Sequence, residues 1–267
     1  MIAKTLIVEG HRGYPSKAPE NTLESFRIAL QEGIHGIEFD IWLTADNVVV
    51  VAHGCNEQGL DKVWDPSKKQ YKHVFIPKTT YAELSQYRIS DKETPICTLE
   101  EVLDLVGYQT SMYLNIEIKP DSDKLVEETL KMVKRKDVTA KLEFCTFVHR
   151  LRPVLDFWCN ELEVNNVGFT YNIQIYEHIE DDELVGSIVT KNDSVSLDIS
   201  LTLMGNESIR TFIRKIKQGG GVAKCYNYMS LTDLENDDLY RQLIEMELDT
   251  FVCNAPERLV EFNRKSI

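Results

Sequence analysis

The sequence predicts an α/β protein whose strands and helices close into a parallel (β/α)8 barrel, the TIM-barrel architecture, within a single domain spanning residues 1–267. Short apolar runs alternate with helical stretches, eight such repeats fit in about 250 residues, and 43% of the residues are hydrophobic, enough for one large core. A doubly wound open sheet is the structural alternative. The expected strands are 6–10, 36–41, 113–118, 142–147, 167–171 with its neighbours, 195–200, 222–227 and 250–254.

The helices between these strands carry recognisable start and stop signals. Polar residues that can cap a helix N-terminus precede four amphipathic stretches: Asn21 with Glu24 and Thr98 with Glu101 in capping-box spacing, Asp121 or Ser122, and Asn206. The three glycines at 219–221 end the helix that Asn206 begins. We expect these helices to form the outer layer of the barrel.

The segment after the second strand departs from this alternation. Residues 43–53 contain the turn sequence TADN followed by VVVVAH, which predicts a hairpin that brings His53 back to the barrel mouth. Residues 54–96 are polar and irregular, and we expect a long loop over the active face with one short helix near 80–86. The hairpin and the loop are therefore an insertion after strand two.

Polar residues gather at the ends of the first three strands. Side chains two residues apart on a strand share a face, so Glu38 with Asp40, and Glu117 with Lys119, each present their charges together. His11 closes the first strand. In a barrel of this kind the carboxyl ends of the strands meet at one mouth, which predicts a single site there.

Three carboxylates at this mouth need a positive partner. Buried, unpaired carboxylates are costly, and their hard oxygen atoms select Mg²⁺ or Ca²⁺, so Glu38, Asp40 and Glu117 are candidate metal ligands. The alternative is a set of salt bridges to Arg12 and Lys119. From the residues alone, both interpretations stay open.

Two histidines flank the carboxylates. Singly, His11 and His53 would be ordinary structural residues, but together they suit a phosphodiester reaction that needs one proton acceptor and one proton donor. Arg12 can hold phosphate oxygens with two hydrogen bonds, and Lys119 can add a point charge. The pair Glu20–Asn21 is expected to order the site, as a helix cap and as a partner of Arg12 or of a metal-bound water.

Taken together, these motifs resemble the glycerophosphodiester phosphodiesterase family. The match rests on six motifs in order: His11-Arg12-Gly13, Pro19-Glu20-Asn21-Thr22, Glu38-x-Asp40, Thr44-x-Asp46, His53 and Glu117-x-Lys119. The resemblance implies a divalent cation on Glu38, Asp40 and Glu117, with His11 and His53 as the acid/base pair. It also implies that Arg12 and Lys119 act on the substrate phosphate.

The resemblance implies metal-dependent hydrolysis of a small-molecule glycerophosphodiester to sn-glycerol 3-phosphate and an alcohol. An alternative is a lysophospholipase D or phospholipase C-like activity on lysophospholipid or phosphatidylglycerol, which would be marked by an exposed apolar rim. A third is a barrel that binds a phosphodiester without hydrolysing it, although such a barrel has no need of the complete set of ligands and histidines.

The sequence also departs from the family pattern. His53 is followed by Gly54 where the family usually has aspartate, and residues 224–227 read Lys-Cys-Tyr-Asn where the family commonly has Trp-Thr-x-Asn. The last strand keeps Asn254-x-Pro256. Glu9, in a usually apolar position, is either a partner for Lys224 inside the barrel or a fourth acidic group near the metal.

Composition excludes several partners. A formal charge of −13 opposes nucleic acid and anionic membrane surfaces, so no nucleic-acid partner is expected. No apolar run reaches the roughly 18 residues of a membrane span, so we expect no stable insertion into a membrane, although transient membrane contact is compatible with the sequence.

Six scattered cysteines without metal-ligand spacing, and no leader sequence, indicate free thiols in a cytoplasmic protein. The oligomeric state is not determined by the sequence.

Overall fold

The computed structural model describes residues 5–54, 60–89, 91–119, 122–165, 167–191 and 193–266, without the side chains of Asp61, Met229 and Ser230. Asp121 as a helix cap, the Cys55 thiol, and residues 55–59 and 90 of the expected loop lie outside this range. No helix within the described part has the length and apolar content needed to cross a membrane.

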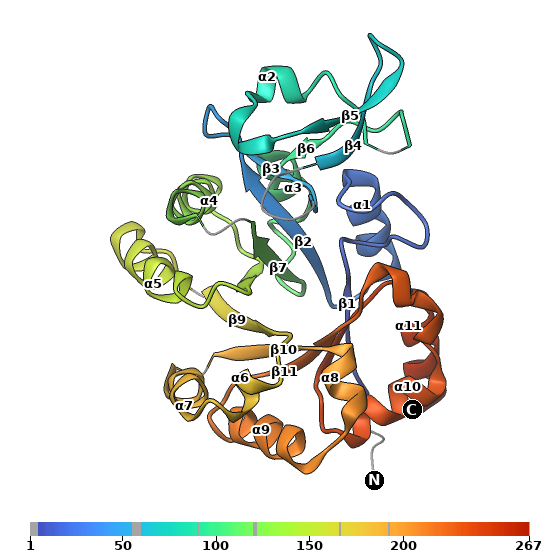
Figure 1. Cartoon of the computed structure of the whole chain (residues 1–267), viewed down its shortest axis with the longest axis vertical. Helices are drawn as coiled ribbons and strands as arrows, with labels where there is room; N and C mark the ends of the chain where they lie inside the picture. The colour runs from blue at the N-terminus through green and yellow to red at the C-terminus, as the bar shows by residue number, and fades with distance from the viewer. Residues whose placement is uncertain are drawn as a thin grey trace.

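Eight parallel strands within the described residues form a closed barrel, which confirms the predicted fold (Figure 1). Strand β1 pairs with β12 on one side and with β2 on the other, so the sheet closes on itself and the open-sheet alternative is wrong. The strands are β1 (Ile7–Gly10), β2 (Gly36–Leu43), β7 (Tyr113–Ile118), β8 (Lys141–Thr146), β9 (Val167–Ile173), β10 (Ser194–Asp198), β11 (Ala223–Tyr226) and β12 (Thr250–Cys253).

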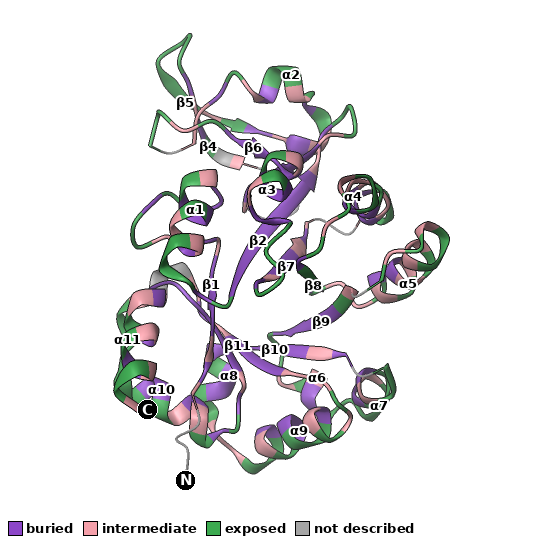
Figure 2. Cartoon of the chain, turned by 180° about the vertical axis from the view of Figure 1, so that it is seen from behind, coloured by how far each residue is buried: buried purple, intermediate pink, exposed green. Residues whose placement is uncertain are grey.

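Helices cover the barrel and pack their apolar faces against the strands. Figure 2 shows buried strands at the centre and helices whose outer faces are exposed. The helices are α1 (Leu23–Glu32), α3 (Leu99–Val106), α4 (Asp123–Lys136), α5 (Leu151–Leu162), α6 (Glu177–Glu180), α7 (Asp182–Lys191), α8 (Ile199–Met204), α9 (Glu207–Gln218), α10 (Asp237–Glu245) and α11 (Pro256–Ser266), with a 3₁₀ segment η3 (Met229–Leu234).

Three of the predicted helix starts are confirmed and one is wrong. Thr98 forms a full capping box with Glu101, and the side chains of Ser122 and Asn206 accept hydrogen bonds from the first turns of α4 and α9. At α1 the cap is Thr22 instead of Asn21. Asn21 has a positive φ of 56°, which turns its side chain away from the helix and toward β2.

The hairpin after β2 is confirmed. Strand β3 (Val49–Val51) runs antiparallel to the second half of β2, with Leu43 opposite Val49, and then pairs with the short β6 (Cys97–Thr98). The first two residues of β2, Gly36 and Ile37, pair with β1, whereas its last three residues extend past β1 and pair with β3. His53 follows β3 directly and returns to the mouth.

The expectation of an irregular loop at 54–96 is wrong. This insertion contains an antiparallel pair, β4 (Leu60–Asp65) and β5 (Gln70–Val74), a 3₁₀ turn η2 (Ile76–Lys78) and the short helix α2 (Tyr81–Leu84), which confirms the helix expected near 80–86. It packs a second apolar cluster on the hairpin: Trp42, Val50, Ala52, Val63, Val74, Ile76, Leu84, Tyr87 and Ile96. The insertion lies at one end of the long axis in Figure 1.

Candidate active site

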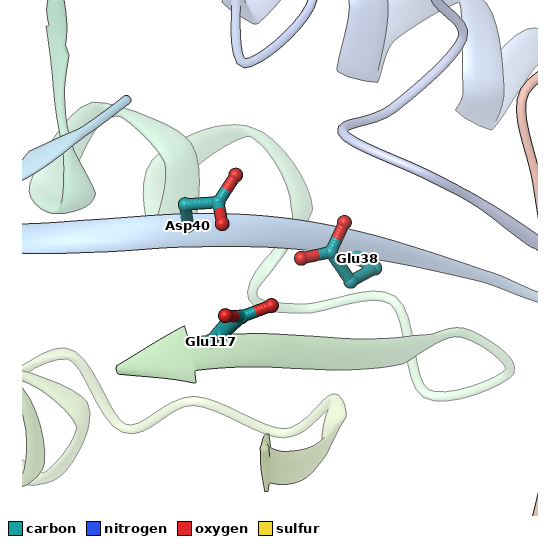
Figure 3. A group of neighbouring side chains, drawn as sticks. All are labelled: Glu38, Asp40 and Glu117. Atoms are coloured by element: carbon teal, nitrogen blue, oxygen red, sulfur yellow. The ribbon is translucent and has the colours of Figure 1, made fainter. Parts of the chain in front are cut away.

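Glu38, Asp40 and Glu117 meet at the mouth of the barrel. Figure 3 shows Glu38 and Asp40 on β2 and Glu117 on β7 with their carboxyl groups turned toward one another. Asp40 lies directly opposite Glu117 in the parallel register of the two strands. One oxygen of each carboxylate lies within 4.8 Å of the others, and Glu38 and Asp40 are buried.

Two of these carboxylates are paired with basic groups. The Lys119 Nζ atom lies 3.1 Å from Asp40 Oδ1 and 2.8 Å from Glu117 Oε1. The Arg12 Nε atom lies 3.5 Å from Asp40 Oδ2, and the Asn21 amide donates to the same oxygen at 2.9 Å. Burial alone would raise the pKa of Asp40, but Lys119 and Arg12 lower it well below its usual range.

Glu38 is only partly compensated by Arg12. Its Oε2 atom accepts a hydrogen bond from the Arg12 main-chain N–H at 3.0 Å, but Oε1 is buried without a partner among the described residues. Burial and the charges of Asp40 and Glu117 raise the pKa of Glu38. Salt bridges therefore account for Asp40 and Glu117 but leave Glu38 incomplete. An unpartnered buried oxygen beside two further carboxylates fits a divalent cation with oxygen ligands.

Arg12 occupies a tight turn after β1. Its φ is 56°, and a Cβ at Gly10 would lie only 1.8 Å from the Gly13 oxygen, so the turn needs glycine at position 10. The turn aims the Arg12 guanidinium at Glu20, whose Oε2 accepts a hydrogen bond at 2.9 Å. The expected pairing of Glu20 with Arg12 is thus confirmed.

His11 is held in one orientation by Asn254. Its Nδ1 atom lies 2.8 Å from Asn254 Oδ1, and Asn254 Nδ2 donates to the Tyr228 carbonyl at 2.8 Å, which sets which end of the amide faces His11. The His11 proton is therefore assigned to Nδ1, leaving a lone pair on Nε2, 3.8 Å from Glu38 Oε2. Burial and the Arg12 charge lower the pKa of His11 to about 3.

His53 is half-buried and less constrained. Within the described residues its ring has no hydrogen-bond partner, although Trp42 Nε1 donates to the His53 carbonyl at 3.1 Å and fixes the main chain. Burial lowers the pKa of His53 to about 4 against the opposing effect of Asp40. Gly54 follows with a φ of 68°. The hairpin thus positions the main chain of His53, while its ring has no side-chain partner in the part of the chain that the structure describes.

Glu9 belongs to the barrel interior. Lys224 Nζ lies 2.8 Å from Glu9 Oε1 and also bonds to Glu143, while Asn115 donates to the other Glu9 oxygen at 3.0 Å. The interpretation of Glu9 as a partner for Lys224 is confirmed, and its interpretation as a fourth acid at the metal is wrong. A charged network therefore fills the barrel beneath the mouth.

The structure brings together all seven predicted site residues and adds the roles of two asparagines. Asn254 orients His11, and Asn21 donates to Asp40 instead of capping α1. Both asparagines lie in motifs visible in the sequence, but the sequence does not indicate which residue each of them contacts. Asn254 sits at the end of β12, far from His11 in sequence, and only closure of the barrel brings them into contact.

Comparisons with known proteins agree with this geometry. A glycerophosphodiester phosphodiesterase from Bacillus altitudinis is 31% identical over 162 residues, which are 55% of this chain and 62% of that protein. The chain spans about three fifths of the length of the curated relatives it matches first.

Solved structures share the fold over nearly the whole chain. A structure described as a glycerophosphoryl diester phosphodiesterase from Silicibacter pomeroyi has a TM-score of 0.78 at 20% identity and covers 98% of this chain and 94% of its own. A phosphodiesterase from Oleispira antarctica, solved with the product sn-glycerol-3-phosphate, has a TM-score of 0.73 at 22% identity. The match covers 97% of this chain and 96% of that one. Residues 11–258 match the glycerophosphoryl diester phosphodiesterase family, and the chain belongs to that family.

Proposed function

We propose that this protein is a metal-dependent hydrolase that converts glycerophosphodiesters to sn-glycerol 3-phosphate and an alcohol. The observation that carries the proposal is the unpartnered, buried Glu38 oxygen within a cluster of three carboxylates. Family membership supports phosphodiester hydrolysis, and the product bound by the Oleispira antarctica relative has the expected chemistry.

Glu38, Asp40 and Glu117 would hold the cation, Mg²⁺ or Ca²⁺, through carboxylate oxygens. A divalent cation at this position supplies Lewis acidity toward a phosphoryl oxygen. Arg12 and Lys119 bind the remaining phosphoryl oxygens and offset the negative charge that develops on them. The contacts of Arg12 and Lys119 with Asp40 keep both side-chain charges directed into the site.

The two histidines move the protons. Neutral His11 presents the Nε2 lone pair and accepts the proton of the nucleophile, which is either water or the neighbouring glycerol hydroxyl. Attack by water gives sn-glycerol 3-phosphate directly, whereas attack by the hydroxyl gives a cyclic phosphate that water then opens to sn-glycerol 3-phosphate. Protonated His53, a state that the neighbouring Asp40 charge favours, donates a proton to the oxygen of the leaving alcohol. Asn254 is a positioning residue because it acts only through His11.

The test is a substrate and metal panel. Glycerophosphocholine, -ethanolamine, -inositol and -glycerol should each be incubated with protein and Mg²⁺, Ca²⁺ or excess chelator, and the phosphorus products identified. The proposal expects sn-glycerol 3-phosphate with a divalent cation and none with chelator. Tight binding of these diesters without product would instead support the phosphodiester-binding barrel.

A second candidate is lysophospholipid hydrolysis, and one observation favours it. Exposed apolar side chains occur on the segments that follow β8, β9 and β10: Phe147 is 42% exposed, Ile175 52% and Met204 57%. The insertion contributes less, because Trp64 packs against Tyr71 and Lys92 covers both rings. A faster rate with lysophosphatidylcholine than with glycerophosphocholine, lost in Met204→Ser and Ile175→Ser, would establish this candidate.

We also propose that the chain acts as one catalytic domain in the cytoplasm. The described cysteines, Cys97, Cys145, Cys159, Cys225 and Cys253, are free thiols, and most of them are buried. Free thiols are typical of a reducing compartment. Fractionation of cells that produce the tagged protein would check this location.

A further inference from the structure

A cavity adjoins His53, between the insertion and the segment before α1. Its volume is about 350 Å³, which is within the range of small-molecule sites. His53 and Glu20 form part of its wall, and Val51, Val63 and Ile89 contribute apolar surface. The cavity therefore adjoins the proposed proton donor and is built largely by the insertion and its hairpin.

The charges around this cavity are unequal. Glu20 is already paired with Arg12, whose NH1 atom lies 2.9 Å from the Glu20 carboxylate. Lys62, an exposed residue of β4, also lines the cavity and forms no ion pair with any described residue. The one uncommitted charge among the described lining residues is thus positive.

We propose that this cavity receives the alcohol half of the diester and that Lys62 biases the enzyme toward uncharged or anionic alcohols over quaternary ammonium alcohols. The inference rests on the proposed function. If His53 protonates the leaving oxygen, the alcohol must lie next to His53, and His53 lines this cavity. The Lys62 ammonium repels a cationic head group, whereas a polyol such as inositol can accept its hydrogen bonds.

The experiment compares substrates that share glycerol 3-phosphate and differ only in the alcohol. KM and kcat are measured for glycerophosphocholine, glycerophosphoinositol and glycerophosphoethanolamine with the wild-type chain, Lys62→Met and Lys62→Glu. Lys68→Glu is the matched control, since Lys68 is an exposed lysine of the same insertion outside the cavity lining. Ile89→Trp tests the volume of the cavity independently of charge.

The expected result is that Lys62→Glu shifts the kcat/KM ratio toward the choline substrate by about three- to fivefold, the size expected for one solvent-exposed charge contact. Most of the shift should appear in KM. Lys68→Glu should leave the ratio unchanged, and Ile89→Trp should raise KM for the inositol substrate more than for glycerophosphoethanolamine. An equal change for every alcohol would place the glycerol half in this cavity and overturn the inference.

Calorimetric binding of the same two diesters separates this inference from the hydrolytic function. If the wild-type chain hydrolyses neither diester but Lys62→Glu reverses their relative Kd, the inference stands and the proposed hydrolysis fails. If the diesters are hydrolysed and neither KM nor Kd depends on Lys62, the inference fails and the hydrolysis stands.

Discussion

The two histidines of the site are held in different ways. His11 is buried and tied to Asn254, so its tautomer is set by the hydrogen bonds around it. His53 follows a hairpin strand, and Gly54 supplies no side chain that could orient its ring. In the proposed mechanism, the proton acceptor His11 is therefore rigidly oriented, whereas the ring of the proton donor His53 has no hydrogen-bond partner among the described residues.

Replacing either histidine should abolish most turnover. We expect His11→Ala and His53→Ala each to lower kcat by roughly 10²- to 10⁴-fold with the fold intact, the usual contribution of a positioned acid or base. A substrate with an activated aryl leaving group should restore much of the rate in His53→Ala but not in His11→Ala, because aryl oxides leave without protonation. Rescue of His11→Ala instead would exchange the two roles.

Gly54→Asp should raise kcat or shift the pH profile of kcat. A carboxylate at this position can accept a hydrogen bond from the His53 ring and favour its protonated form. The φ of 68° disfavours most side chains, but Asp tolerates this region better than most. Gly54→Ala is the control for backbone strain alone. Equal pH profiles in all three proteins would show that another group already orients His53.

The charged residues of the site could be predicted from the sequence because their spacing and chemistry are local. Two acids on alternate strand positions share a face whatever the fold does elsewhere. The amides could not be placed in the same way. Asn21 lies where a helix cap is expected, and its actual contact with Asp40 depends on a positive φ that no neighbouring residue requires.

At the scale of elements, strand β2 links the barrel to the insertion. Its first residues pair with β1 inside the barrel, its middle presents Glu38 and Asp40, and its last residues pair with β3 beneath the insertion. The eight barrel strands were predictable from their apolar runs. The strands β4 and β5 were not, because β5 is largely exposed and its polar residues resemble a loop.

Ile76→Ala should destabilise the protein. Ile76 is fully buried in the second apolar cluster, and truncation of such a side chain costs about 2–5 kcal/mol. Chemical unfolding monitored through Trp42 and Trp64, the tryptophans near this cluster, measures the loss. Tyr71→Ala, which removes a side chain that is 45% exposed, is the control. Unchanged stability in Ile76→Ala would show that the second apolar cluster contributes nothing to folding, as expected for a loop.

At the scale of the whole molecule, the negative charge should make a cation essential for substrate binding. The three carboxylates exceed Arg12 and Lys119 by one charge, and the chain carries −13. A phosphodiester anion is therefore repelled from the metal-free site. A divalent cation reverses the sign of the local charge.

Removal of the metal should therefore abolish hydrolysis and raise the Kd for phosphodiesters. Glu38→Gln should weaken cation affinity by more than the roughly 10–100-fold typical of losing an outer-shell partner. Glu24→Gln, at an exposed carboxylate of α1, is the control. Full activity in excess chelator, with metal absence verified by elemental analysis, would falsify this account of the site.

The pairing that closes the barrel is also its shortest ladder. β1 and β2 share two residue pairs, Glu9 with Gly36 and Gly10 with Ile37, whereas β2 and β7 share six. We call this β1–β2 pairing the seam. The Arg12 main-chain N–H, just after β1, donates across it to Glu38 on β2, so an active-site contact adds to the two ladder pairs.

Sub-global opening of the barrel should therefore begin between β1 and β2. Because Arg12 and Glu38 belong to both the seam and the site, sn-glycerol 3-phosphate with Mg²⁺ should slow amide hydrogen exchange at Gly10 and Ile37 more than at Ile116 in β7. Equal slowing at all three positions would mean that the ring of strands opens only as a unit. Bound substrate would then not stabilise the β1–β2 pairing more than the other pairings. Selective slowing at Gly10 and Ile37 would instead show that ligand binding helps to keep the barrel closed.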